Sequence, residues 1–301
     1  MFSKLFAESG LSLDRLKALL AVGAAGSIVK ATGSDPVKQS QYSRQIKELE
    51  DFFRIKLVER HGKGIRLTSN GKELARISRF FLLGLSNFQR GCLAEEQTFR
   101  IGASATCIRQ FLLPVVSSAK VIRSDTRYIV ETVSDDEIER RLHDLTLDFG
   151  VTTRAALSRP LQLKELGKWR LSLCVPLTLY KTDKSASLAF KERRLPLALA
   201  AKELEACGIN DFSNHDCRLT CDNFLQALEA LNGQQVAAVL PDFLVPDGGS
   251  KSFLRARMPG VESRTFYFRL AWNPRLLRLN PQAVHRKDSL AEALVSQLRR
   301  Q

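Results

Sequence analysis

The order of helical patterns near the start of the chain limits its possible folds more than any other feature. Apolar residues recur at helical spacing over about 12–24 and again over about 37–53. Between them, Ser27 can cap a second helix. This helix must be short, because Gly33-Ser34-Asp35-Pro36 consists of residues that favour turns. Two longer helices joined by a short helix and a turn predict a helix-turn-helix.

The residues after the third helix predict a hairpin and a long helix. Two short β-prone runs, 55–60 and 65–68, flank a basic tip that contains glycine. A long amphipathic pattern then extends from about 69 to 89. Helix, helix, turn, helix and hairpin is the order of a winged helix-turn-helix. The long helix carries too many apolar residues for a lone exposed helix, so we expect it to pair with a second copy of the chain.

The third helix places polar side chains opposite its apolar stripe. Ser40, Arg44 and Lys47 lie opposite Ile46 and Leu49. With their neighbours and two basic hairpin residues, the candidate DNA contacts are Lys38, Gln39, Ser40, Gln41, Ser43, Arg44, Lys47, Lys63 and Arg66. Arginine can form two hydrogen bonds to guanine and glutamine two to adenine, while serine and lysine suit phosphates. The pattern favours double-stranded DNA as a partner; the alternative is an ordinary solvated helix face.

The net charge of +14 agrees with a polyanionic partner, and the basic excess is densest in the first third. Charge alone does not distinguish DNA from RNA, a membrane surface or a merely solvated surface. No apolar run approaches the ~18 residues of a membrane helix, and the start lacks a secretory signal pattern. We therefore expect a cytoplasmic protein with no membrane partner.

Several blocks in register resemble the LysR-type family of transcriptional regulators. The matching residues are Gly26-Ser27, Ala31, Val37, Gln39, Ser43-Arg44-Gln45-Ile46-Lys47-Glu48-Leu49-Glu50, Leu57-Val58-Glu59-Arg60, Gly64-Ile65-Arg66-Leu67-Thr68 and Gly71. The resemblance implies DNA contacts at Gln39, Ser40, Ser43, Arg44 and, from the wing, Arg66. The chain departs from the family at Asp35, where leucine is usual, and at Lys38 and Ser40. These departures predict a shortened second helix and a third helix without its usual N-cap.

From Thr98 onward, strand and helix patterns alternate, which favours an α/β domain with parallel strands. Four segments resemble the family's effector domain, which is similar to periplasmic binding proteins: Arg100-Ile101-Gly102-Ala103-Ser104, Leu112-Leu113-Pro114, Leu147-Asp148-Phe149-Gly150-Val151 and Leu240-Pro241. The expected domains are 1–68 for the winged helix-turn-helix, 69–97 for a linker and dimerisation helix with a hinge, and 98–301 for the effector-binding domain. Its two lobes are expected at about 98–175 with 268–301, and at 176–267.

Hydroxyl and carboxylate side chains follow predicted strands of the second domain, where open α/β sheets bind ligands. The candidate effector-binding residues are Ser104, Thr106, Thr152, Thr153, Thr220 and Asp222. They suit a small anionic or polar molecule at free helix amides. The alternative is that these residues only cap helices. Two glycines usual in the family are absent near Leu145 and before Leu240, so a constitutive or architectural DNA-binding protein with a degenerate sensing domain is a rival hypothesis.

The cysteines allow two further hypotheses. Cys207, Cys217 and Cys221 lie where peroxide-sensing members of the family carry a switching disulfide, although their surroundings match poorly. The same cysteines with His215 could bind a metal, but the spacing fits no common zinc pattern. No nucleophile elbow or phosphate loop is present, so we expect no enzyme and no cofactor. The favoured interpretation is a regulator that is controlled by a small molecule and forms a dimer or tetramer, which would read a palindromic site.

Overall fold

The computed structural model describes residues 5, 10–61, 64–93, 96–118, 121, 124–209, 212, 214–245, 252–258, 261 and 263–299. The chain divides into two compact units, Met1–Leu93 and Ala94–Gln301, and each is described by itself.

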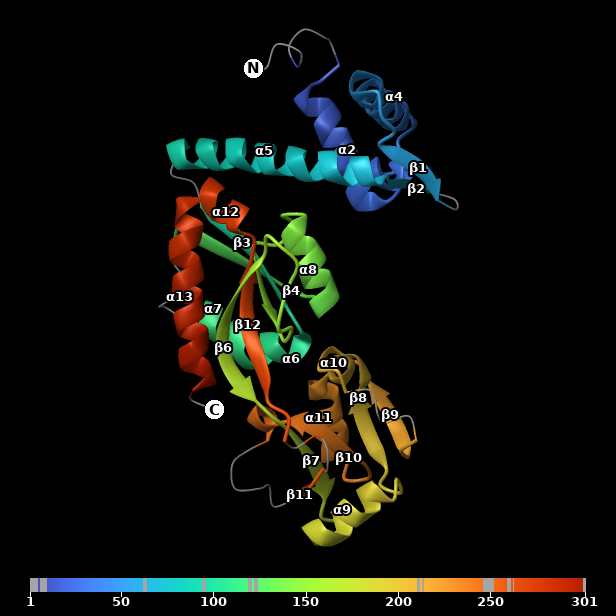
Figure 1. Cartoon of the computed structure of the whole chain (residues 1–301), viewed down its shortest axis with the longest axis vertical. Coiled ribbons are helices and arrows are strands. Elements are labelled where there is room, and N and C mark those ends of the chain that lie inside the picture. Colours follow the sequence, from blue (N-terminus) through green and yellow to red (C-terminus); the bar gives the residue numbers. More distant parts are fainter. Residues whose placement is uncertain are drawn as a thin grey trace. The chain divides into compact units, whose positions relative to one another are not determined.

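The first unit is a winged helix-turn-helix, as the sequence predicts (Figure 1). Its elements are α2 (Leu13–Ala25), α3 (Ile28–Ala31), α4 (Pro36–Phe53), β1 (Val58–His61), β2 (Gly64–Leu67) and α5 (Ser69–Leu93). The two strands pair in antiparallel register, Val58 opposite Leu67 and Arg60 opposite Ile65. The short α3 agrees with the turn residues that follow it.

Local caps begin each helix of the helix-turn-helix. The hydroxyls of Ser12 and Ser27 accept the amides of Arg15 and Lys30. Helix α4 lacks the family's usual N-cap, as expected, but it has another that the sequence analysis did not name. Asp35 is the cap, and its Oδ1 accepts the amides of Val37 at 3.0 Å and Lys38 at 3.3 Å. Aspartate is among the best capping residues, so the departure from the family replaces one cap with another.

Glu50 joins α4 to the wing. Its side chain is buried, and Oε1 accepts the amides of Leu57 at 2.8 Å and Val58 at 3.3 Å. Oε2 accepts Lys56 Nζ at 3.0 Å. Leu57 also belongs to the apolar core formed by Leu16, Leu19, Leu49 and Leu57. At the start of α5, a Cβ on Gly71 would lie 2.0 Å from the carbonyl oxygen of Leu57, so only glycine fits there.

The second unit contains two five-stranded mixed sheets, one in each lobe. The sheet of the first lobe has the order β4-β3-β5-β12-β6 and comprises β3 (Gln97–Ala103), β4 (Thr126–Thr132), β5 (Phe149–Thr152), β6 (Gln162–Trp169) and β12 (Phe266–Trp272). In it β3 runs parallel to β4 and β5, whereas β12 is antiparallel to β5 and β6.

The sheet of the second lobe has the order β11-β7-β10-β8-β9 and comprises β7 (Leu171–Pro176), β8 (Leu197–Ala200), β9 (Cys217–Cys221), β10 (Ala237–Pro241) and β11 (Phe253–Ala256). The expected lobe boundary near residue 175 is wrong by one strand, because β7 pairs with β10 and β11 rather than with the first sheet. The chain therefore crosses between lobes at Arg170, directly after β6. The sequence of an apolar strand does not indicate which sheet it joins, because sheet membership depends on the distant strands with which it pairs.

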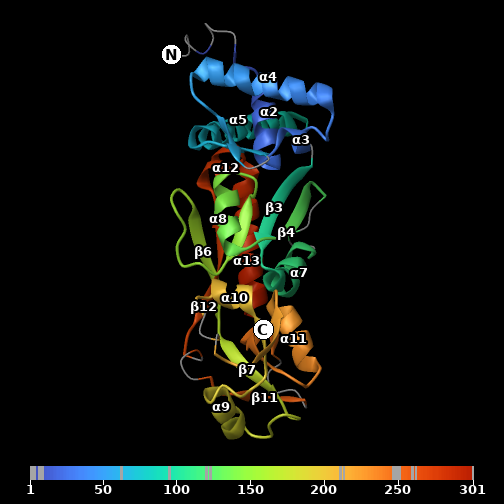
Figure 2. The ribbon, with the colours of Figure 1, turned by 90° about the vertical axis from the view of Figure 1, so that its right-hand side faces the viewer.

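Helices cover both faces of the first sheet, with α8 on one face and α7 and α13 on the other (Figures 1 and 2). The helices of this lobe are α6 (Ala105–Cys107), a π-helical turn (Ile108–Leu112), α7 (Leu113–Val116), α8 (Asp135–His143), α12 (Pro274–Leu279) and α13 (Pro281–Leu298). In the second lobe they are α9 (Asp183–Lys191), α10 (Ala201–Ala206), α11 (Phe224–Asn232) and a 3-10 turn (Asp242–Leu244). Within the described residues, no helix combines the length and apolarity that crossing a membrane requires.

Candidate functional site

The outward face of α4 is the first candidate site. Six of the seven predicted contacts on this helix are exposed: Lys38, Ser40, Gln41, Ser43, Arg44 and Lys47. Gln39 is half-buried because it lies nearer the core side, where Ile46 and Leu49 are buried. In the wing, Arg66 is exposed and its Nε lies 2.6 Å from Glu59 Oε1. Lys63 lies outside the described residues.

An ion-pair chain holds Arg44 on this face. Its Nε donates to Glu48 Oε1 at 2.8 Å, and Glu48 Oε2 accepts Arg15 Nε from α2 at 2.6 Å. The hydrogen bonds from Arg44 and then Arg15 lower the pKa of the Glu48 carboxyl, so it stays ionised. The Arg44 side chain is 82% exposed, which leaves the two terminal nitrogens of the guanidinium open for a bidentate contact.

Charge is unevenly distributed along α4. Lys38, Arg44 and Lys47 are exposed in its first two-thirds, whereas the exposed residue of the next turn on the same face is Asp51. The helix dipole adds positive charge at the same end as Lys38. The exposed cations Lys38, Arg44 and Lys47 therefore favour a polyanion along the N-terminal part of α4.

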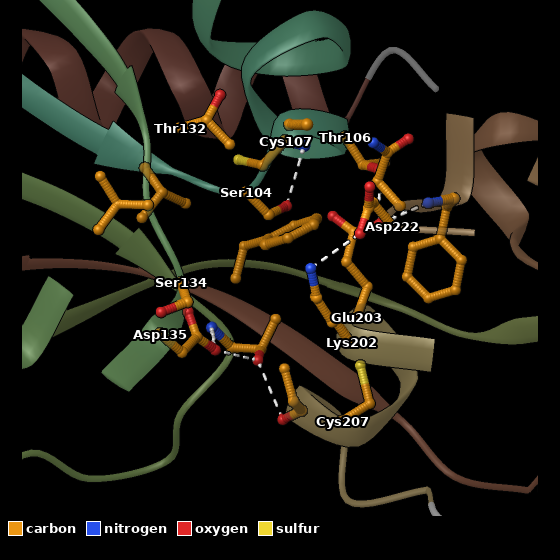
Figure 3. A pocket seen from close by; sticks show the side chains of 18 of the residues that line it. Ser104, Thr106, Cys107, Thr132, Ser134, Asp135, Lys202, Glu203, Cys207 and Asp222 are labelled. Carbon is orange, nitrogen blue, oxygen red and sulfur yellow. Dashed lines mark hydrogen bonds and ion pairs between the residues drawn. The ribbon is translucent and has the colours of Figure 1, made fainter. Parts of the chain in front are cut away.

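The second candidate site is a pocket of about 280 Å³ in the second unit (Figure 3). It lies where strands of both lobes end: Ser104 follows β3, Ser134 and Asp135 follow β4, and Lys202 and Glu203 follow β8. This is the edge at which open α/β sheets bind ligands. The pocket is lined by Ser104, Ala105, Thr106, Cys107, Thr132, Val133, Ser134, Asp135, Val151, Thr153, Trp169, Lys202, Glu203, Ala206, Cys207, Asp222, Asn223, Phe224, Phe243 and Phe268.

Four of the six predicted effector residues line this pocket: Ser104, Thr106, Thr153 and Asp222. Thr152 does not, and its side chain is buried in the fold. Successive residues of a strand point to opposite faces, and here Val151 and Thr153 take the pocket side. Thr220 does not line it either; its hydroxyl lies 3.8 Å from Cys217 Sγ on the exposed strand β9.

The predicted hydroxyls bind partners inside the protein. Ser104 caps α6 by accepting the amide of Cys107 at 3.3 Å. Thr106 donates to Glu203 Oε2 at 2.7 Å, a bond that joins the two lobes (Figure 3). Both the amide and the hydroxyl of Thr153 donate to Asp135 Oδ2, at 3.1 and 2.6 Å. Ser104 thus caps a helix as well as lining the pocket, while Thr106 and Thr153 donate hydrogen bonds to carboxylates.

The sequence reasoning missed both of these carboxylates and the aromatic wall. Asp135 is the first residue of α8, a position that gives little sign of a pocket in the sequence. Glu203 lies on α10, which has only six residues and therefore shows no clear periodicity. The wall consists of Trp169, Phe224, Phe243 and Phe268. Trp169 stacks on Phe268 with ring centroids 5.5 Å apart and meets Phe243 edge-on at 5.7 Å.

The cysteines of this unit give little support to a redox switch. Cys107, Cys174, Cys207, Cys217 and Cys221 are free thiols. Burial raises the pKa of Cys207 to about 12, with smaller effects from Asp135 and Glu203. Burial also raises the pKa of Cys221. A raised pKa lowers the population of the thiolate, which is the reactive form. No cluster of potential metal ligands is found within the described residues.

Comparison with protein families identifies both units. The model described as "Bacterial regulatory helix-turn-helix protein, lysR family" matches residues 13–72. The model described as "LysR substrate binding domain" matches residues 94–295. The second match alone covers more than half of the chain.

The chain is 32% identical over 146 residues to the HTH-type transcriptional regulator cbl of Klebsiella aerogenes. This alignment covers 46% of this chain and 46% of that protein. The aligned part thus spans under half the length of the curated relatives, 46% and 44%. ArgP from Mycobacterium tuberculosis has a similar fold, with a TM-score of 0.67, 20% identity, and coverage of 94% of this chain and 97% of that one. Full-length LysG from Corynebacterium glutamicum with bound effector Arg also has a similar fold. Its TM-score is 0.62 and its sequence identity 16%, and the match covers 95% of this chain and 99% of that one.

Proposed function

Because the chain belongs to the LysR family of bacterial regulators, we propose that it is a cytoplasmic, sequence-specific DNA-binding transcriptional regulator controlled by a small-molecule effector. The single observation that carries the DNA-binding part is the exposed face of α4, with Arg44 held by Glu48. The family consists of regulators rather than enzymes.

The proposed reading of DNA divides the work between Arg44 and Lys47. Arg44 presents two parallel donors, which match the acceptors O6 and N7 of one guanine in the major groove. Lys47 lies about one turn later and carries a compact charge that suits a phosphate. Lys38, Gln39, Ser40, Gln41 and Ser43 supply the remaining helix contacts, and Arg66 holds the adjacent backbone from the wing. Two copies related by a two-fold axis would place two such helices on a palindromic site.

The second unit is proposed to sense the effector. A pocket of about 280 Å³ at the strand ends supports this over the rival hypothesis of a degenerate domain, for which a cleft filled with side chains would be expected. The LysG relative carries Arg as a bound effector, so the shared fold can hold a small molecule.

The test uses full-length protein and a duplex selected from a random DNA pool, compared with a scrambled duplex at several salt concentrations. Arg44→Ala should cost about 1–3 kcal/mol on the selected duplex and change scrambled binding much less. Lys47→Ala should weaken both and reduce the salt slope by about one. Lys191→Ala is the matched control, because it removes an exposed cation from the second lobe. Equal losses on both duplexes for Arg44→Ala would contradict its role as a base reader.

A further inference from the structure

The charged residues that line the pocket are unbalanced. Among the described lining residues, Asp135, Glu203 and Asp222 are acidic and only Lys202 is basic. Lys202 Nζ lies 2.8 Å from Asp222 Oδ1, and both side chains are exposed, so this pair neutralises itself at the rim. Asp135 and Glu203 have no ion-pair partner in the described part of the chain. The inner pocket is therefore negatively charged.

Two backbone amides at the pocket already donate to its carboxylates. The amide of Thr153 donates to Asp135 Oδ2 at 3.1 Å, and the amide of Phe224 donates to Glu203 Oε2 at 2.6 Å. A ligand carboxylate or phosphate that used either amide would have to displace a side chain of its own charge. This arrangement disfavours the anionic ligand that the hydroxyl pattern suggested, because like charges repel strongly where solvent is excluded.

Among the residues that the structure describes, two buried polar atoms of the lining lack hydrogen-bond partners. They are the acceptor Oε1 of Glu203 and the donor Nε1 of Trp169, a residue only 3% exposed. Buried polar groups in native proteins are nearly always paired, so an unpaired atom calls for an explanation. A bound molecule that donates to Glu203 Oε1 supplies one here. Figure 3 shows Glu203 directed toward Thr106 at the centre of the site, away from Cys207.

The rest of the wall suits a flat apolar body. Trp169, Phe224, Phe243 and Phe268 contribute aromatic surface, and aromatic faces attract cations as well as apolar groups. A volume of 280 Å³ holds roughly nine water molecules at about 30 Å³ each, which limits the ligand to a small molecule.

The two carboxylates also affect the two thiols of the pocket. Burial raises the pKa of Cys107 and of Cys207, and for both thiols Asp135 and Glu203 raise it further. The two carboxylates thus act on Cys107 of the first lobe and Cys207 of the second.

We infer that the pocket takes a small organic cation, an ammonium group on a compact aromatic body, with Glu203 as its main charged partner. The inference rests on the proposed effector function and specifies the chemical class of the effector. Asp135 adds negative charge from the first lobe, so a bound cation would contact carboxylates on both lobes.

Three probes with the same phenyl body and different head groups test this: 2-phenylethylammonium, 2-phenylethanol and phenylacetate. Calorimetric titration of the full-length protein should give the tightest binding for the ammonium, on the order of tenfold tighter than the alcohol, and the weakest for phenylacetate. Glu203→Gln keeps the shape and removes the charge, so it should abolish the preference for the ammonium. Glu205→Gln, an exposed change on the same helix and outside the lining, should leave it intact.

Asp135→Asn provides a second variant in case Glu203→Gln unfolds the domain, and it should reduce the same preference. Tighter binding of phenylacetate than of the ammonium, an unchanged preference in both variants, or no binding of any probe at millimolar concentration would overturn the inference. Titration of the selected duplex is carried out in parallel. Loss of duplex binding would contradict the proposed regulator, whereas failure of the probes alone would contradict only the effector class.

Discussion

Replacement of Glu50 tests how the wing is held to the recognition helix. In Glu50→Ala, the amide of Leu57 loses its acceptor in a place where Leu57 is fully buried, and the half-buried amide of Val58 loses its acceptor too. A buried donor without a partner costs about 1–3 kcal/mol, and a partly solvated one costs less. We therefore expect a loss of roughly 2–4 kcal/mol in the free energy of unfolding of the first unit.

Glu50→Gln separates the hydrogen bonds from the charge. Both amides donate to Oε1, so a carbonyl oxygen at that place keeps them; only the bond from Lys56 Nζ is lost, because the amide nitrogen that replaces Oε2 cannot accept it. Lys56 is 81% exposed, and an ion pair with so exposed a partner contributes at most about 1 kcal/mol. The glutamine variant should therefore lose about 1 kcal/mol or less.

Scanning calorimetry of the full chain, with hydrogen exchange at Leu57 and Val58, measures both variants. A unit of this size shifts its melting temperature by about 4–8 °C per kcal/mol, so Glu50→Ala should lower it by roughly 8–32 °C. Asp51→Ala, an exposed neighbour, is the control and should change stability by less than about 0.5 kcal/mol. Equal losses in the alanine and glutamine variants would show that charge, rather than the position of an acceptor, holds the wing.

Two further predictions concern assembly and acid. On α5, the apolar residues Ile77, Phe81, Leu85 and Phe88 are 55%, 50%, 45% and 73% exposed. Phe81→Asp should therefore shift the full chain toward monomer in sedimentation at micromolar concentration, whereas Ser86→Asp should not. An unchanged dimer in Phe81→Asp would mean that another surface holds the copies together. Burial alone would raise the pKa of Glu50, but the hydrogen bonds from Leu57, Lys56 and Val58 outweigh it and lower the pKa from 4.5. The stabilisation by the Glu50 carboxylate is then complete above pH 4.5 and is lost as pH falls through the lowered pKa. Calorimetry should therefore show an acid-induced drop in melting temperature that is smaller in Glu50→Gln. The same drop in both proteins would assign the acid sensitivity to other groups.

The first unit could be predicted from the sequence in nearly all its elements. Its helices follow 3.6-residue periodicity, its caps are side chains within three residues of the amides they accept, and its hairpin follows a glycine-containing turn. The cap at Asp35 was missed through reliance on the family pattern, although the residue itself is a strong capping signal. The exposed face of α4 also follows from periodicity alone.

The pocket was decided by tertiary structure. Because side chains alternate along β5 and the residue after it, Thr153 faces the pocket and Thr152 does not. Strand β7 belongs to the second sheet because it pairs with β10. Strand β6 is hard to predict from the sequence, because its exposed charged residues hide the apolar alternation. Glu203 meets Thr106 across 97 positions of sequence, so no local pattern indicates the contact. Helices, caps and turns depend on neighbours a few residues away, which a sequence displays directly. The charge of a pocket depends on which distant side chains meet and which amides they occupy, and only the folded chain determines that.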